Sequence, residues 1–216
     1  TPFTFIATAE TIALLKAKPV FVDIDESTLN IDPSKIEASI TDKTKAIIPV
    51  SLYGQPADLD LIQTIASQYD LKVIIDGAQS FGSTFMGKSE SVFGDICITS
   101  FFPAKPLGCY GDGGAVFTQN ESFASKIRML RVHGQNQRYH HRHVGIGGRL
   151  DTLQAAVLLA KLSFYEQEIA MRQSVAESYT TLLRDSGTEL RLPVIKSDRT
   201  SVWAQYTIRS PKREET

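Results

Sequence analysis

Lys105 lies between two prolines, Pro103 and Pro106, directly after a run of mainly β-branched and aromatic residues at 95–102. Such a run is typical of an inner strand that is covered on both faces. The prolines end the strand and stiffen the following loop, because each one fixes its own backbone angle φ. Open α/β sheets bind their ligands at the carboxyl ends of their strands. Lys105 is therefore a candidate reactive amine, with an ordinary solvated lysine as the alternative.

Asp76 closes a second strand-like run, 71–75, and Ala78 and Gln79 follow it within one turn. We expect its carboxylate to stand at the same sheet edge as Lys105. A carboxylate and an amine in one crevice suit a cofactor that carries a basic ring nitrogen and an aldehyde. The acid would keep the nitrogen protonated and the amine would bond to the aldehyde carbon, which is the chemistry of pyridoxal 5′-phosphate. The alternative is that Asp76 only caps the next turn.

The amine of Lys105 must lose its proton before it can act as a nucleophile. An ordinary lysine has a pKa of about 10.4, so burial or a nearby cation is needed to lower it. The apolar residues Phe101, Phe102 and Pro103 next to the lysine are expected to provide this burial.

The polar segment 133–148 carries four histidines and two arginines. The histidine spacing fits no familiar zinc motif, so we predict no metal and favour a surface for phosphate or carboxylate groups, with a solvated loop as the alternative. Glycines 145, 147 and 148 match the dinucleotide fingerprint poorly, since the final spacing and a preceding strand are missing. Arg149 is expected in the first turn of a helix, where a cation opposes the helix dipole, which predicts that it faces an anion.

Strand-like and helix-like segments alternate around these residues. Strands are expected at 19–24, 44–51, 71–75, 95–102 and 115–118, and helices at 7–16, from 33, 58–69, 121–132, 149–161 and 165–183. This alternation predicts an α/β fold in three layers, with a mostly parallel sheet and right-handed crossovers.

Two long helical segments end near Asp185 and suggest a domain boundary there. Paired helices of this kind commonly leave one domain and approach the next. Strand-like residues follow at 192–194 and 201–208. We therefore expect a large domain at 1–185, incomplete at its N-terminal end, and the truncated start of a small α+β domain at 186–216.

The composition argues against several other classes of protein. With 216 residues, 42% of them hydrophobic, the chain can bury a full core. Its 23 basic and 24 acidic residues nearly cancel, which argues against a general nucleic-acid or membrane surface. Cys97 and Cys109 are too few for a disulfide framework and indicate a reducing, cytoplasmic setting. No apolar run approaches the roughly 20 residues of a membrane helix.

Several motifs occur together and in one order along the chain. They are PFTFIAT at 2–8, FVDID at 21–25, YGQPAD at 53–58, DGAQS at 76–80, SFFPAK at 100–105, GDGG at 111–114 and RLDTLQAA at 149–156. Through them the chain resembles the DegT/DnrJ/EryC1/StrS sugar aminotransferase family of fold-type I pyridoxal-phosphate enzymes. The resemblance covers nearly the whole chain and implies the cofactor-binding large domain of that fold.

The resemblance also implies roles for the candidate residues. Lys105 matches the lysine that binds the cofactor covalently and then moves the proton between the substrate carbon and the cofactor. Asp76 matches the partner of the ring nitrogen, and Gln79 matches the residue that bonds to the phenolic oxygen. Ser100 matches a phosphate contact.

Three further residues complete the implied cofactor site. Phe5 and Ala78 match groups that pack on the two faces of the ring. Arg149 matches a residue that reaches the site of a neighbouring subunit and touches a cofactor or nucleotide phosphate, which implies a homodimer with shared sites. Gly147 stands where the family commonly has asparagine, so that contact would be left to Arg149 and backbone amides.

Segments 104–114 and 138–149 most resemble the branch that aminates UDP-2-acetamido-2-deoxy-3-oxo-glucuronic acid for surface polysaccharide such as lipopolysaccharide O-antigen. This implies a nucleotide-sugar substrate with L-glutamate as the amino donor. The family also contains regulators and sugar dehydratases, and the dehydratases have histidine where this chain has Lys105. A non-catalytic fragment or binding module is a further alternative, because family chains are longer at both ends.

Overall fold

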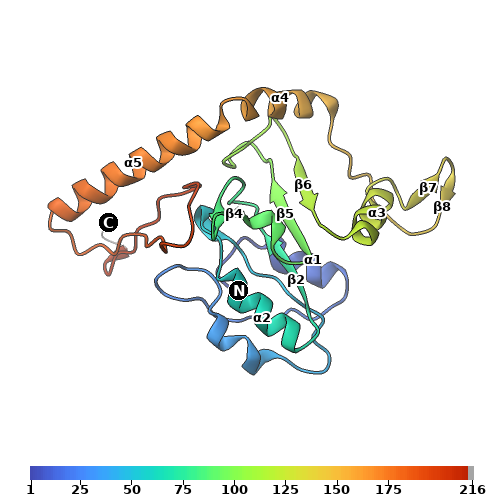
Figure 1. Cartoon of the computed structure of the whole chain (residues 1–216), viewed down its shortest axis with the longest axis horizontal. Helices are drawn as coiled ribbons and strands as arrows, with labels where there is room; N and C mark the ends of the chain where they lie inside the picture. Colours follow the sequence, from blue (N-terminus) through green and yellow to red (C-terminus); the bar gives the residue numbers. More distant parts are fainter. Residues whose placement is uncertain (214–216) are drawn as a thin grey trace.

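The computed structural model describes residues 1–213, and the last residues of the expected second domain, 214–216, lie outside this range. In the described part of the chain, the central sheet has the strand order β1-β2-β5-β6 (Figure 1). Its strands are β1 (Ala46–Ile47), β2 (Lys72–Asp76), β5 (Ile96–Ser100) and β6 (Gly114–Phe117). β2 runs parallel to β1 and to β5, whereas β6 is antiparallel to β5. The predicted α/β fold with a mostly parallel sheet is confirmed.

One face of the sheet packs on helix α2 (Leu59–Gln68) and forms the larger core cluster. Successive strand residues point to opposite faces, so Val73, Ile75 and Cys97 share the face toward α2, and each is at most 2% exposed. The helix contributes apolar residues spaced along one side: Leu59, Ile62 and Ala66. Burial of a large apolar side chain stabilises the fold by about 1.5–3 kcal/mol.

A second core cluster lies where helices α4 (Thr152–Leu162) and α5 (Tyr165–Asp185) meet the segment that follows β5. Its buried members are Phe101, Leu107, Cys109, Leu158 and Tyr165. The Tyr165 hydroxyl donates a hydrogen bond of 2.6 Å to the Phe81 carbonyl, which ties the start of α5 to the turn that follows β2.

The opposite face of the sheet is less covered. Ile74, Ile96 and Ile98 point to it and are only half-buried. Helix α1 (Ala7–Leu14) meets this face, because its Thr8 reaches the side chain of Asp76 at the end of β2. The three expected layers are therefore present, but the expectation that β5 is fully covered holds only on the side toward α2.

The remaining elements surround this framework. They are α3 (Glu121–Leu130), the hairpin strands β3 (Thr84–Phe85), β4 (Lys88–Ser89), β7 (Gln135–Gln137) and β8 (His140–His141), and 3-10 helices at Pro33–Lys35, Glu37–Ser39, Leu52–Gly54 and Glu90–Val92. The hairpin of β7 and β8 projects beyond α3, away from the sheet (Figure 1). The segment 133–148, expected as a loop, thus contains a short hairpin.

Three of the predicted strands do not form among the described residues. The segment 19–24 makes a single bridge, between Ile24 and Ile31, and the segments 192–194 and 201–208 are not strands. An apolar run becomes a strand only where another backbone edge is available to pair with it. Whether such an edge is available cannot be read from the residues of the run itself.

Two further elements are shorter than predicted. The helix expected from residue 33 is replaced by 3-10 turns, although Asp32 still acts as the cap and accepts a 3.0 Å hydrogen bond from the Ser34 amide. The strand expected at 44–51 is broken after β1, because Pro49 has no N–H to donate, and pairing with β2 resumes only as a single parallel bridge between Val50 and Asp76.

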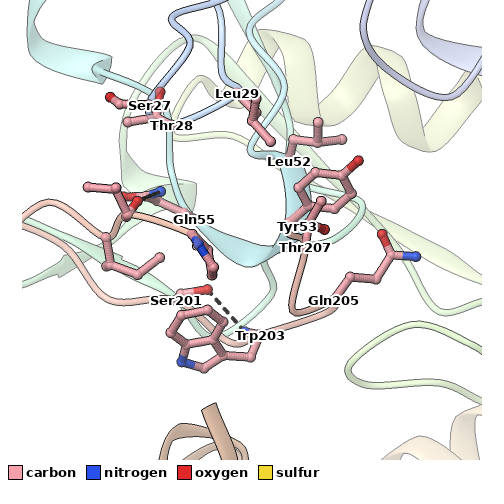
Figure 2. A pocket seen from close by; sticks show the side chains of 13 residues that line it. Ser27, Thr28, Leu29, Leu52, Tyr53, Gln55, Ser201, Trp203, Gln205 and Thr207 are labelled. Carbon is pink, nitrogen blue, oxygen red and sulfur yellow. Dashed lines mark hydrogen bonds between the residues drawn. The ribbon is translucent and has the colours of Figure 1, made fainter. Parts of the chain in front are cut away.

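The tail after α5 packs back on the turn at residues 53–54. The amides of Val202 and Ala204 donate 3.0 Å hydrogen bonds to the carbonyls of Gly54 and Tyr53. A Cβ atom at Gly54 would lie 2.9 Å from the Trp203 amide nitrogen, and the φ of Gly54 is +106°, so the contact requires glycine. Figure 2 shows the small hollow that Trp203 shares with this turn.

None of the helices in residues 1–213 has the length and apolarity to span a bilayer. Cys97 and Cys109 are buried free thiols, and burial raises the pKa of Cys97 above its ordinary value.

Candidate active site

The carboxyl ends of β2 and β5 lie side by side at one edge of the sheet. Asp76, the last residue of β2, pairs with Ile98, and Ser100 ends β5 two residues later. Because the strands are parallel, both ends open at the edge where α/β sheets bind ligands. Asp76, Ser100 and the loop that carries Lys105 therefore start from one place.

The carboxylate of Asp76 is held by two hydrogen bonds. The Thr8 hydroxyl donates to Oδ2 at 2.6 Å, and the Ala78 amide donates to Oδ1 at 3.2 Å. The residue is 8% exposed, so the group is oriented and nearly dry. Thr8 was not predicted as a site residue, and the only sequence feature that could have indicated it is its place in the motif at 2–8.

Gln79 is oriented by the turn that precedes α2. Its Oε1 accepts a 2.7 Å hydrogen bond from the Tyr53 amide. Tyr53 itself has a left-handed φ of +58°, a conformation that non-glycine residues adopt rarely. Since the Oε1 faces Tyr53, the Nε2 of Gln79 remains available as a donor.

The lysine loop, residues 101–113, is compact. The Lys105 amide donates to the Phe102 carbonyl at 2.8 Å, which closes a turn around Pro103. The Cys109 thiol is buried and donates to the Phe101 carbonyl at 3.0 Å. In the described part of the chain, no hydrogen bond or ion pair engages the Lys105 amine.

Helix α4 clamps the lysine loop from outside. The Lys161 amine donates to the Gly108 carbonyl at 2.6 Å and also lies 5.1 Å from the centre of the Tyr110 ring. The Gln154 Oε1 accepts from the Tyr110 amide at 2.7 Å. These two helix residues were not predicted from the sequence, because they lie more than 40 residues from the loop.

Replacement of Gly108 by alanine should disrupt this loop. The new Cβ atom would lie 2.5 Å from the Pro103 carbonyl oxygen and 2.9 Å from that of Phe102, and backbone atoms cannot move aside easily. We expect a loss of about 1–3 kcal/mol in the free energy of unfolding, measured by chemical denaturation.

Gly111→Ala is the matched control in the same loop. Its Cβ atom would meet only the flexible side-chain amide of Gln154, at 3.1 Å, so a loss of about 0.5 kcal/mol is expected. Equal losses for the two variants would show that the close approach at Gly108 does not constrain the loop.

The other predicted cofactor residues, Ser100, Phe5 and Ala78, keep at least part of their side chains available to a ligand. The Ser100 hydroxyl accepts from the Phe102 amide at 3.2 Å and keeps its own proton available for donation. Phe5 lies just before α1 and is 70% exposed, so its ring can still pack on a ligand. Ala78 is half-buried beside Asp76.

Arg149 does not lie in a helix, which corrects the prediction. Helix α4 begins at Thr152 with Asp151 in the cap position, and the preceding segment is held to the end of α3 by a 2.8 Å bond from the Gly148 amide to the Arg131 carbonyl. Arg149 is exposed, and within residues 1–213 no hydrogen bond or ion pair joins it to Asp76 or Lys105. The helix-dipole argument for an anion therefore does not apply.

The histidines of the 133–148 segment are spread over the β7–β8 hairpin and its flanks. His141 places its Nδ1 2.9 Å from the His133 carbonyl oxygen. Among the described residues, no group of three or more His, Cys, Asp or Glu side chains is arranged to hold a metal ion.

The donor set fits pyridoxal phosphate. The oriented carboxylate of Asp76 suits a protonated ring nitrogen, the Gln79 Nε2 suits an anionic phenolic oxygen, and the Ser100 hydroxyl suits a phosphate. The unpaired amine of Lys105 suits the aldehyde. The same edge thus offers one complementary group for each polar part of the cofactor.

Comparisons with known proteins agree with this chemistry. The model of the DegT/DnrJ/EryC1/StrS aminotransferase family matches residues 1–216. The chain is 57% identical over 212 residues to the UDP-2-acetamido-2-deoxy-3-oxo-D-glucuronate aminotransferase of Pseudomonas aeruginosa, covering 98% of this chain and 58% of that protein. It is 48% identical to a pleiotropic regulatory protein of Geobacillus stearothermophilus, covering 100% of this chain and 58% of that protein.

A solved structure extends the comparison to the cofactor. The NtdA protein of Bacillus subtilis, with bound cofactor PMP, superposes with a TM-score of 0.88 at 35% identity, covering 98% of this chain and 49% of that one. The chain therefore spans less than two thirds of the length of each of these proteins.

Proposed function

Because the chain belongs to the DegT/DnrJ/EryC1/StrS aminotransferase family, we propose that the protein is a pyridoxal-phosphate-dependent aminotransferase acting on nucleotide-activated keto-sugars. The observation that carries the proposal is the pair of adjacent parallel strand ends, one closed by the held carboxylate of Asp76 and the other followed by the free amine of Lys105. A sheet edge with a purely structural role needs neither an oriented, buried carboxylate nor an unpaired amine next to it.

Each site residue has a separate task in this proposal. Asp76 keeps a proton on the ring nitrogen, Gln79 donates to the phenolic oxygen, and Ser100 donates to the phosphate. When bound, the cofactor supplies an electron sink that weakens the bonds at the substrate carbon next to nitrogen. Lys105 removes a proton from that carbon through its Nζ and returns it as a general acid.

The substrate is proposed from the relatives. The similarity to the Pseudomonas aeruginosa enzyme supports UDP-2-acetamido-2-deoxy-3-oxo-glucuronate as the acceptor, L-glutamate as the donor, and a place in surface polysaccharide synthesis such as that of O-antigen. The free thiols of Cys97 and Cys109 support a cytoplasmic setting.

We also propose a homodimer in which the 138–149 segment of one copy, with Arg149, completes the site of the other. Val144 and Ile146 of this segment are 98% and 70% exposed, and a second copy packed on the segment would cover them. The domain boundary near Asp185 likewise remains a proposal. The tail beyond it contacts the large domain through residues 53–58.

Incubation of the protein with pyridoxal phosphate, L-glutamate and the UDP-3-keto sugar should give an amino-sugar, detected by mass spectrometry, together with 2-oxoglutarate. The matched control is a nucleotide 4-keto sugar, for which we expect no product. Amination of the 4-keto sugar alone would refute the proposed substrate.

Two rival functions give different results in the same assay. A dehydratase would form a deoxy-sugar without consuming glutamate. The name of the Geobacillus stearothermophilus relative makes a regulatory role a second candidate. A regulator would bind pyridoxal phosphate or the nucleotide sugar without forming a product.

A further inference from the structure

Glu90 is a buried carboxylic acid that does not belong to the candidate cofactor residues. It begins the 3-10 helix Glu90–Val92 and is only 3% exposed. An acid is rarely buried to this extent unless its oxygens are hydrogen-bonded. A carboxyl group at this position therefore needs hydrogen-bond partners, and the structure provides two.

Both carboxyl oxygens of Glu90 are bonded to serine hydroxyls. Oε2 lies 2.6 Å from the hydroxyl of Ser51, and Oε1 makes a short hydrogen bond with the hydroxyl of Ser80. Oε1 also lies against Gly77, where an added Cβ atom would come within 2.8 Å of it. The carboxyl group thus packs against the backbone of Gly77, the residue that follows Asp76.

The two serines belong to different segments of the candidate site. Ser80 ends the turn that carries Asp76 and Gln79, whereas Ser51 precedes Tyr53, whose amide orients the Gln79 side chain. The Ser51 amide also donates to the Asp76 carbonyl at 3.0 Å. A single group therefore joins both segments that orient the acid and the amide.

The burial of Glu90 makes its neutral form accessible near neutral pH. Burial raises its pKa to about 7, the two serine hydrogen bonds partly oppose this, and the negative charge of Asp76 adds to it. The Cys97 thiol of β5 is the other titratable group that interacts with it, and burial keeps that thiol protonated. In the structure both serine hydroxyls donate to the carboxyl, and when Glu90 is protonated its own O–H can donate one of these two bonds instead, because a serine hydroxyl can also accept.

We infer that Glu90 is a positioning residue of the cofactor site, a buried carboxyl that braces the two segments presenting Asp76 and Gln79 and thereby sets the affinity for pyridoxal phosphate. The inference rests on the function proposed above. Glu90 itself reaches the cofactor only through these segments.

The first test compares Glu90→Gln with Glu90→Ala. Glutamine keeps a donor and an acceptor without charge, so its dissociation constant for pyridoxal phosphate, from absorbance titration, should stay within about twofold of wild type. Alanine removes the brace and should weaken binding by about 10-fold or more, as loss of an orienting partner commonly does.

Ile62→Ala controls for a general loss of stability. Ile62 is fully buried in the core cluster between α2 and the sheet and belongs to neither segment, so this variant should lower the unfolding temperature while leaving cofactor affinity unchanged. If Glu90→Ala binds like Ile62→Ala, or if Glu90→Gln fails like Glu90→Ala, the inference is overturned.

The second test uses the protein without cofactor. The folded pKa of about 7 exceeds the ordinary value of 4.5, so the contribution of Glu90 to stability is complete below pH 4.5 and is lost as the pH rises through 7. Between pH 5 and pH 8.5, the unfolding temperature of Glu90→Gln should therefore rise relative to wild type. A constant difference would overturn the neutral-acid assignment.

The outcomes separate this inference from the function on which it rests. Wild-type protein that binds pyridoxal phosphate, with Glu90→Ala unaffected, would refute only the role of Glu90. Wild-type protein that binds none would refute both.

Discussion

Replacement of Lys105 by alanine should abolish the visible absorbance band that appears when pyridoxal phosphate binds covalently, and should lower turnover by about 10²–10⁴-fold. The reason is that Lys105 is proposed both to bond to the cofactor and to move the substrate proton. Lys105→Arg should fail in the same way, because a guanidinium retains the positive charge but stays protonated at neutral pH.

Lys126→Ala, an exposed lysine of α3, is the matched control and should keep both the band and the turnover. The stability of Lys105→Ala should also match wild type, because the Lys105 amine forms no hydrogen bond or ion pair among the described residues. A Lys105→Ala protein that still develops the band would place the reactive amine elsewhere and remove the basis of the proposed mechanism.

Replacement of Arg199 by alanine should produce the largest loss of stability. The Arg199 side chain is 2% exposed, its Nη2 lies 2.7 Å from the Asp58 carboxylate, and its Nη1 donates to the Pro56 carbonyl at 2.9 Å. Removing one member of a buried ion pair commonly costs about 3–5 kcal/mol. We expect about 3 kcal/mol, the lower end of that range, because Lys196 still faces Asp58 at 2.8 Å.

The measurement is chemical unfolding, with Arg128→Ala as the matched control. Arg128 pairs with Glu121 at 3.3 Å, but both side chains are largely exposed, so a loss of at most about 1 kcal/mol is expected. Trp203, the only tryptophan of the chain, lies four residues after Arg199 and reports on the tail through its fluorescence. Equal losses for the two arginine variants, with unchanged fluorescence, would mean that Arg199 does not anchor the tail.

The runs that end at Asp76 and Ser100 could be recognised from the sequence because a buried strand leaves a local mark. Consecutive apolar residues must lie inside, and a polar residue or proline ends the run. Helices α2, α3 and α5 were identified for the same reason, since apolar spacing along one helix face is also a short-range property. The position of Lys105 after a strand end was likewise visible in the chain order.

The start of helix α4 after Arg149 and the pairing of the 19–24 run were decided by residues outside the patterns from which they were predicted. Asp151 takes the cap position of α4, which leaves Arg149 outside the helix. The 19–24 run has β propensity, but among the described residues it pairs only at Ile24. Propensity states what a segment can form, whereas pairing requires a partner in the right place.

The sequence by itself determined the α/β class, the main buried strands and the residue types that open at their carboxyl ends. Only the tertiary structure decided which groups hold those residues in place. Thr8 reaches Asp76 across 68 residues, Lys161 reaches the lysine loop across 53, and Ser51 reaches Glu90 across 39. The physical reason is that apolar periodicity acts between neighbours along the chain, while an orienting hydrogen bond requires two distant segments to be folded to within about 3 Å.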